Sequence, residues 1–455
     1  MLIRRLALPM LGLSLAACTA DVDPGAAARE QGLSALAAEP SAAEPLATED
    51  LARAGGRERD DLIRLWNSQV LAAARARSLN DAQVARSLAM VHVAMYDAIN
   101  GITGEREPAM VAPSAAARGS CAAAATRAAH DVLVALFPED AQTYDSVLTG
   151  TLATISDAPT AAAGAAWGAA VAAEVIARRA NDGSTPAESQ PAGTGPGQFR
   201  AAFSNAQFRR LVPFAIASAA PYISSGPPAL TTTDYAAAYA EVQILGSAAI
   251  VDPDKAATFT FWSLGNGTSQ PPGAWAQIAS DLSTTHPRSL ASGARLFALL
   301  SMAMADSVAP TYASKFQSHA WRPTTAIREG DTDGNPLTAP DATWAARAGS
   351  VGGTPEHCSG HSSFSAAAAT VLAGVFCDDE IAFDFASESA PAGARHYESF
   401  SAAMTEAGRS RVFGGQHFEF SNQAGLRAGK RIAREVLSTK LLRRKGPTHL
   451  GSCPL

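Results

Sequence analysis

The sequence is poor in charge and has no excess of basic residues. Charged side chains make up 17% of the 455 residues, and the formal net charge is −6. A chain that binds nucleic acid through its phosphates needs a basic face, so nucleic acid is not expected as a partner. Hydrophobic residues make up 47% of the chain, which is enough for a sizeable core.

Strand-like patterns are also scarce. Few stretches alternate between apolar and polar residues, whereas apolar residues recur at helical spacing over much of the chain. Asn80 is well suited to cap such a segment. Further helices are predicted at Ala122–Phe137, Ala141–Ile155 and Ala161–Ala180. The predicted fold class is therefore all-α, and the many alanines predict close approach between helices.

Long apolar runs are missing after the N-terminus, where none reaches the roughly 18–20 residues of a membrane-spanning helix. The N-terminus itself has a targeting pattern. Two arginines precede the apolar stretch Leu6–Leu15, and two alanines precede Cys18. This resembles the signal of bacterial lipoproteins, in which Cys18 would be lipidated and become the only membrane anchor; an ordinary secretory peptide is the alternative. In both cases export is expected, as an outer-membrane lipoprotein or to the periplasm or cell surface.

Composition divides the chain into five parts. Residues 1–18 are the predicted signal peptide, and residues 19–57, rich in alanine, proline and glutamate, read as a flexible tether. A first helical half follows at 58–180. A proline- and glycine-rich connection at 181–230 leads to a second helical half at 231–445. The predicted architecture is a helical bundle of two bundle-like halves.

The motif Ser359-Gly360-His361 precedes the alanine-rich run Ser362–Phe376, which predicts a buried helix. At the start of a helix the backbone N–H groups have no intrahelical partner, and the helix dipole favours negative charge. Such an end can bind an anion. His361 could exchange a proton with a bound group. The plainer alternative is that Ser359 only caps the helix.

Cationic side chains occur at fixed spacing on both sides of this motif. Lys315 and Arg322 are seven residues apart, so both would project from one face if the segment were helical. Arg411 and His417 are six residues apart, and a glycine pair between them predicts a break, with Arg411 at a helix end and His417 just beyond the turn. The guanidinium fork suits a tetrahedral oxyanion. The pattern therefore predicts one oxyanion pocket built from three separated segments.

Taken in order, Lys-x6-Arg-Pro, Ser-Gly-His and Ser-Arg-x5-His resemble the three-part signature of the superfamily that unites type 2 phosphatidic acid phosphatases with vanadium haloperoxidases. The residues of Phe316–Glu329 and Val84–Asn100 resemble bacterial haloperoxidase-like members rather than short acid phosphatases. The likeness spans Leu62 to Val436. It implies a single helical unit made of two bundle-like halves.

The resemblance also implies a role for each pocket residue. His417 would be the axial ligand of vanadate in a haloperoxidase, or the nucleophile in a phosphatase. His361 would be the acid–base group in both. The residues that would bind vanadate, or phosphate in the same site, are Lys315, Arg322, Ser359, Gly360 and Arg411.

Three functions remain open from the sequence. The first is a haloperoxidase that uses vanadate and hydrogen peroxide to oxidise a halide to a hypohalous acid equivalent. The second is an acid phosphatase that hydrolyses a small phosphomonoester through a histidine nucleophile. The third is a surface lipoprotein that keeps the fold as a non-catalytic binding module.

Two positions depart from the family pattern. Many members carry an aspartate four residues after the last histidine, where this chain has Ser421. The aspartate can accept from the histidine ring and orient it, and the Ser421 hydroxyl is a weaker acceptor for His417. Cys358 stands where proline is most common, and a thiol beside an oxidising site needs to be buried or bonded. Cys358 and Cys377 flank the predicted helix, whose length of roughly 28 Å predicts no disulfide between them unless the helix breaks at Gly374.

Two further assignments compete with the oxyanion pocket or extend it. A zinc site from His357, His361 and His417 would need helix at both of the first two positions, whereas Ser359-Gly360 predicts a helix start between them. Asp306 is a candidate partner for His361, only because it lies near Lys315 in the sequence.

Overall fold

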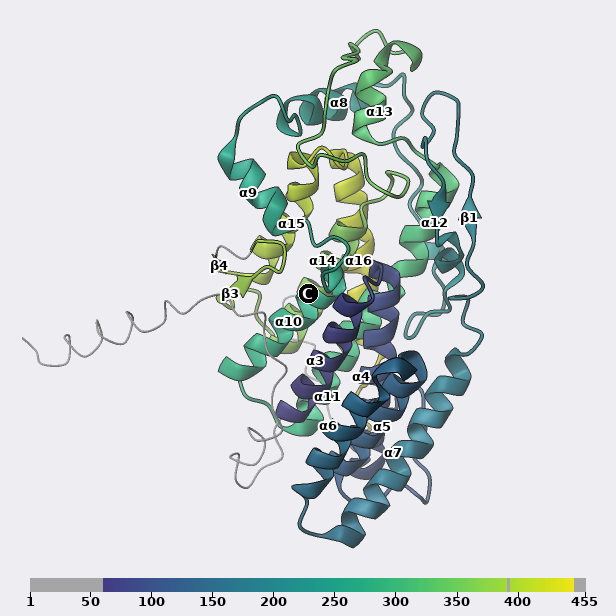
Figure 1. The fold of residues 1–455 in the computed structure, drawn as a ribbon, viewed down its shortest axis with the longest axis vertical. Helices are drawn as coiled ribbons and strands as arrows, with labels where there is room; N and C mark the ends of the chain where they lie inside the picture. The colour runs from purple at the N-terminus through teal and green to yellow at the C-terminus, as the bar shows by residue number, and fades with distance from the viewer. Residues whose placement is uncertain (1–59, 391–392, 446–455) are drawn as a thin grey trace, which may run out of the picture. The chain divides into compact units, whose positions relative to one another are not determined.

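The computed structural model describes residues 60–390 and 393–445, which belong to one compact unit covering 43–455. Cys18, the predicted signal peptide and the predicted tether at 19–57 lie outside the described residues. The described chain is mostly helical, with two short antiparallel strand pairs, as Figure 1 shows. The all-α prediction is confirmed.

The first helices follow the apolar spacing of the sequence. The Asn80 side chain accepts a hydrogen bond from the Gln83 N–H, and the Gln83 side chain accepts one from the Asn80 N–H, which closes a capping box. The predicted helices are confirmed to within a few residues at their ends. They are α4 (Asp81–Thr103), α5 (Cys121–Leu136), α6 (Ala141–Ala153) and α7 (Ala158–Arg179), and α3 (Asp61–Ala76) precedes them.

The connection between α7 and α8 contains short strands and 3-10 turns, which pack along α12 and α16. Asp306 fixes this connection to the bundle, because its carboxylate accepts the N–H groups of three consecutive residues, Phe214, Ala215 and Ile216. The candidate pairing of Asp306 with His361 is therefore wrong, since Asp306 bonds to these backbone donors and the His361 ring bonds to the Ser263 carbonyl. The elements here are β1 (Ser189–Gln190), β2 (Phe203–Ser204), η2 (Ala206–Arg210) and η3 (Ala220–Tyr222).

The C-terminal helices surround the run that begins with Gly360. Ser359 caps α14 and Ser399 caps α15, each side chain accepting an N–H from the first turn. The helices are α8 (Thr233–Leu245), α9 (Pro253–Phe261), α10 (Gln270–Thr285), α11 (Leu290–Asp306), α12 (Val308–Ser318), α13 (Pro323–Arg328), α14 (Gly360–Phe376), α15 (Phe400–Phe413) and α16 (Glu419–Thr439). The remaining elements are the 3-10 turns η1 (Pro138–Asp140) and η4 (Gly330–Thr332), and the strands β3 (Phe383–Ala386) and β4 (Ala394–Tyr397).

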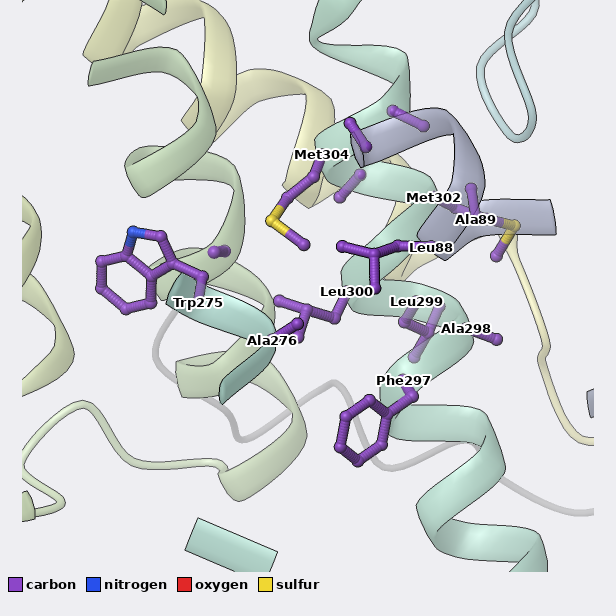
Figure 2. Packing of buried hydrophobic residues seen from close by; sticks show 14 of the residues in the cluster. Leu88, Ala89, Trp275, Ala276, Phe297, Ala298, Leu299, Leu300, Met302 and Met304 are labelled. Atoms are coloured by element: carbon purple, nitrogen blue, oxygen red, sulfur yellow. The ribbon is translucent and has the colours of Figure 1, made fainter. Parts of the chain in front are cut away.

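The core is organised around α11. Its apolar residues point in all directions, and α4 and α10 pack on it, so that side chains such as Leu88, Trp275 and Leu300 meet in the interior (Figure 2). These three side chains are fully buried. Truncating one such leucine to alanine removes roughly 2–5 kcal/mol of stability. The same apolar cluster runs from Leu62 to Leu441, so helices before and after the connection share it.

α14 and α16 lie unusually close together because α16 presents glycines to its partner. A Cβ atom on Gly425 would lie 2.4 Å from the carbonyl oxygen of Ser359, and one on Gly429 would lie 2.1 Å from that of Ser363. Only residues without a side chain fit there. This approach confirms the prediction of close helix packing, and it presses the first turn of α14 against the segment that begins α16.

Two described helices are long and apolar enough to cross a membrane, Ala158–Arg179 and the continuous stretch Leu290–Ser318. The sequence analysis expected no apolar segment of membrane-spanning length after the N-terminus, and the length and composition of these two helices contradict that expectation. The apolar window of the second is wholly buried in protein, as is usual for a core helix, and that of the first is 33% buried.

Candidate active site

Lys315 and Arg322 reach the site from two different helices. Lys315 lies in the last turn of α12, which begins directly after Ser307, the C-cap residue of α11. The helix ends at Ser318, and Arg322 is the N-cap residue of α13, directly before Pro323. The prediction that one helix face carries both cations is wrong.

Arg322 is held by backbone and side-chain acceptors. Its Nε donates to the Thr354 carbonyl at 2.7 Å, and one terminal nitrogen donates to the Thr354 hydroxyl at 3.0 Å. The other terminal nitrogen donates to the Gln416 carbonyl at 2.7 Å and lies 3.1 Å from Nε2 of His417. Arg322 thus joins the segment before α14 to the loop after α15.

Arg411 lies in the last turn of α15, as predicted, and is nearly unpartnered. Its guanidinium donates to the Trp262 carbonyl at 3.4 Å and lies 5.2 Å from the centre of the Phe259 ring. Its Nε is buried without a hydrogen-bond partner. A buried guanidinium with one long hydrogen bond has donors to spare for a ligand.

His417 follows the turn at Gly414 and Gly415, as predicted, and it is buried. The turn requires glycine at 415, where φ is +69°. Nδ1 of the ring lies 3.0 Å from Oε1 of Glu356, and Nε2 lies 3.1 Å from Arg322. Since a guanidinium only donates, Nε2 must accept, and Nδ1 carries the ring hydrogen. Burial, and then the charge of Arg322, lower the pKa of His417 well below its ordinary value, so the ring is neutral.

His361 stands in the first turn of α14, partly buried. Its Nε2 lies 3.0 Å from the carbonyl oxygen of Ser263. A carbonyl only accepts, so Nε2 carries the hydrogen of the neutral ring and Nδ1 keeps a lone pair. Burial, followed by the nearby charge of Arg411, lowers the pKa of His361 well below its ordinary range.

Ser359 and Gly360 form the predicted helix start. The Ser359 hydroxyl oxygen accepts the Ser362 N–H at 3.3 Å, and the Ser359 N–H donates to the carbonyl of Ser421 at 3.2 Å. The second bond ties the start of α14 to the first turn of α16. The N–H groups of Gly360 and His361 belong to the first turn, where they have no intrahelical partner.

Glu356 is the main residue that the sequence analysis missed. It is fully buried, and its carboxylate accepts hydrogen bonds from Nδ1 of His417, from the Phe418 N–H at 2.9 Å and from the Ser421 hydroxyl at 2.6 Å. Burial raises the pKa of Glu356 to about 7. A carboxylate five residues before His361, next to a proline, was a signal that could have been used.

Backbone carbonyls also accept hydrogen bonds from the site's side chains, and no sequence motif predicts these carbonyls. Lys315 Nζ donates to the Pro355 carbonyl at 2.6 Å, and the consecutive carbonyls of Trp262 and Ser263 accept from Arg411 and His361. The loop after α9 therefore contributes two acceptors to a site whose side chains come from elsewhere.

The site has a surplus of buried positive charge. Lys315, Arg322 and Arg411 are only 4%, 5% and 7% exposed. Burial and the charge of Arg322 lower the pKa of Lys315 to about 7 and that of Arg411 to about 9, and burial lowers the pKa of Arg322 to about 10. Buried cations that repel one another, with spare donors on Arg411, fit a multiply charged oxyanion such as vanadate or phosphate.

His357 does not belong to a zinc site with His361 and His417. Its Nε2 lies 2.6 Å from the Ser224 hydroxyl and its Nδ1 lies 2.8 Å from the Ser421 hydroxyl, so both nitrogens are engaged away from the other two rings. No cluster of potential metal-ligating side chains occurs in residues 60–390 and 393–445. The donors gathered here are cationic, which suits an anion and not a metal cation.

The cysteine next to the motif is a buried thiol. Cys358 is free and 2% exposed, and burial raises its pKa, so the reactive thiolate is disfavoured. Cys377 is disulfide-bonded. Since Cys358 is free, the two do not pair, as the length of α14 predicted.

Comparison with known proteins agrees with this geometry. Residues 295–444, which contain all the predicted pocket residues, match the family model of the vanadium chloroperoxidase (VCPO) second helical-bundle domain. No match is found among the curated proteins.

Three solved structures are similar over most of the chain. A bacterial vanadium-dependent iodoperoxidase is 20% identical, with a TM-score of 0.71, covering 86% of this chain and 98% of its own. A holo-type bacterial vanadium-dependent chloroperoxidase is 16% identical, with a TM-score of 0.60 and coverages of 79% and 92%. An apo-type bacterial chloroperoxidase is 14% identical, with a TM-score of 0.61 and coverages of 79% and 95%.

At these identities the solved structures establish the shared fold, and the family model adds the C-terminal domain that carries the three motifs. The chain has the fold of the vanadium haloperoxidases, and its residues 295–444 match the VCPO second helical-bundle domain.

Proposed function

We propose that this chain is a vanadium-dependent haloperoxidase-like enzyme, which uses vanadate and hydrogen peroxide to oxidise a halide. The observation that carries the proposal is the surplus of buried positive charge around two neutral imidazoles, His361 and His417. The bacterial relatives, described as an iodoperoxidase and a chloroperoxidase, support this choice.

The residues present fit vanadate as the bound group. Lys315, Arg322 and Arg411 would balance its negative charge, and the first-turn N–H groups of α14 would donate to its oxygens. Nε2 of His417 would hold the vanadium. When bound, vanadate supplies a Lewis-acidic centre that activates peroxide toward attack by halide.

His361 is the proton-transfer group in this proposal. Its Nε2–H is held by the Ser263 carbonyl, so Nδ1 is the atom that takes a proton from incoming hydrogen peroxide and later returns it. The overall reaction joins hydrogen peroxide, halide and one proton to give hypohalous acid and water. A neutral ring in the resting protein is the form that this role needs.

A phosphatase on the same pocket is the second candidate. His417 also has the features of a nucleophile: Nδ1 donates to a carboxylate, and the Nε2 lone pair, which accepts from Arg322, faces the cations. The donors that hold vanadate would hold the phosphoryl group of a small phosphomonoester. The non-catalytic binding module would keep the anion and do neither reaction.

A paired assay separates these functions. Halogenation of a phenolic dye is measured with vanadate, peroxide and iodide or bromide, and hydrolysis of a chromogenic phosphate ester is measured without vanadate. The proposal expects the first activity, its loss in His417→Ala, and inhibition by phosphate competing for the pocket. Hydrolysis without halogenation would overturn it in favour of the phosphatase. Phosphate binding with neither activity would leave the binding module.

A further inference from the structure

A chain of hydrogen-bonded side chains leads from His417 away from the cationic pocket. Nδ1 of His417 lies 3.0 Å from Oε1 of Glu356, and Oε2 of Glu356 lies 2.6 Å from the hydroxyl of Ser421. That hydroxyl lies 2.8 Å from Nδ1 of His357, whose Nε2 lies 2.6 Å from the hydroxyl of Ser224. The chain ends at an open cavity of about 420 Å³, lined by Ser224, His357 and Arg427 among others.

The direction of each hydrogen bond in this network follows from the Arg322 guanidinium, which only donates, and the Glu356 carboxylate, which only accepts. Arg322 forces Nε2 of His417 to accept, so Nδ1 donates to Glu356. The Ser421 hydroxyl donates its one hydrogen to Glu356, so its oxygen accepts from Nδ1 of His357. Nε2 of the neutral His357 ring then accepts from the Ser224 hydroxyl.

Ser421 links His357 to Glu356: its hydroxyl donates to Oε2 of Glu356, and its oxygen accepts from Nδ1 of His357. Glu356 then accepts three hydrogen bonds, from the His417 ring, the Phe418 N–H and the Ser421 hydroxyl. A carboxylate is the only side-chain group that accepts at both oxygens without donating.

Ser224 and His357 also resemble a catalytic pair, because a serine hydroxyl beside a histidine is the arrangement of an activated nucleophile. Burial, together with the charges of Lys315 and Arg427, lowers the pKa of His357 to about 3. Nδ1 of His357 bonds to the Ser421 hydroxyl and not to a carboxylate, so no counter-charge would balance the ring after it took a proton from Ser224. The pair is therefore better suited to holding its neighbours than to chemistry of its own.

We propose that Glu356 is a positioning residue that fixes His417 as the Nδ1–H tautomer, and that Ser421, His357 and Ser224 hold the Glu356 carboxylate from behind. This inference rests on the proposed anion site at Nε2 of His417. It also accounts for Ser421: the carboxylate that the family resemblance leads one to expect there comes from the segment before α14. Ser421 serves as the hydroxyl that orients it.

The test uses the full chain with ¹⁵N-labelled histidine, and His417→Gln to assign the His417 signals. The ¹⁵N shifts of the two ring nitrogens report the tautomer, and calorimetry reports the affinity for inorganic phosphate. Glu356→Gln keeps a carbonyl oxygen that can accept from Nδ1, so the Nδ1–H tautomer should remain. Glu356→Leu removes every acceptor, so the tautomers should mix and phosphate affinity should fall roughly 10–100-fold.

Ser421→Ala provides a milder variant if Glu356→Leu does not fold. It removes one hydrogen bond to Glu356, and it should shift the His417 signals and weaken phosphate binding by roughly threefold to tenfold. The matched control is Ser301→Ala, which breaks another buried serine–histidine contact, 2.7 Å between Ser301 and His92. The control should alter neither the His417 signals nor phosphate affinity.

The outcomes separate this inference from the proposed function. An Nε2–H tautomer in the wild type, or His417 signals unchanged in Glu356→Leu or in Ser421→Ala, would overturn the positioning role even if phosphate binds. If the wild type binds no phosphate while the tautomer depends on Glu356, the positioning role stands and the proposed anion site fails.

Discussion

Replacing Arg411 by methionine should stabilise the free protein while removing its affinity for oxyanions. The guanidinium is buried, its Nε has no hydrogen-bond partner, and the Trp262 carbonyl that accepts from it lies 3.4 Å away. Most substitutions of buried residues destabilise a protein. A gain in the stability of Arg411→Met would therefore indicate that the buried guanidinium serves to bind a ligand and does not stabilise the fold.

The size of the gain can be bounded from the charge. Burial lowers the pKa of Arg411 from its ordinary value to about 9. At 1.36 kcal/mol per unit, this gap of roughly 3.5 units sets a ceiling of about 5 kcal/mol. Losing the contact with Phe259, at 5.2 Å, offsets part of it. Replacing buried charges by apolar side chains of similar volume often stabilises by about 1–4 kcal/mol, so we expect about 1–3 kcal/mol.

Urea unfolding of the free protein in phosphate-free buffer at pH 8 measures this difference, and Arg434→Met, an exposed arginine on α16, is the control. Adding phosphate should then stabilise the wild type, by about 2.7 kcal/mol at a concentration of 100 times the dissociation constant, and leave Arg411→Met unchanged. A less stable Arg411→Met, an equal gain in the control, or undiminished stabilisation of the variant by phosphate would refute the reasoning.

Three further predictions follow from other parts of the molecule. Asp306→Ala leaves the Phe214, Ala215 and Ile216 N–H groups without their acceptor and should lower the free energy of unfolding by about 2–4 kcal/mol, measured by urea unfolding. Sulfate is a useful test anion because it does not titrate near pH 7. Its affinity should fall by up to about tenfold per pH unit above the Lys315 pKa of about 7, because sulfate binding raises that pKa and takes up a proton. Calorimetry should show a weaker dependence of sulfate affinity on pH in Lys315→Met. Cys18→Ala should move the exported protein from the membrane fraction to the soluble fraction, as immunoblotting would reveal.

The pocket could be anticipated from the sequence because its side chains are of types that seldom gather in a protein interior without a ligand. Buried cations repel one another, so cations at fixed distances around a serine-glycine-histidine helix start indicate a bound anion. The glycine pair after Arg411 marked the turn before His417. The helix start at Ser359 was predictable for a similarly local reason, since serine caps and the alanine-rich run propagates.

The failures have equally local causes. The left-handed conformation of His319, with φ of 46°, ends α12 between Lys315 and Arg322. Histidine is not a residue type that predicts this helix end. Asp306 was assigned by nearness in sequence, whereas its partners are backbone N–H groups some 90 residues earlier. The carbonyls of Trp262 and Ser263 carry no side-chain signal. Glu356 was visible but unassigned, because its contact with His417 depends on the packing of α14 against α16.

The most direct test of the oxyanion pocket is a crystal structure of the protein soaked with orthovanadate. The proposal predicts vanadium bonded to Nε2 of His417, with Lys315, Arg322 and Arg411 contacting its oxygens and the contact between Arg322 and Nε2 replaced. Vanadate bound elsewhere, with Nε2 of His417 still accepting from Arg322, would contradict it.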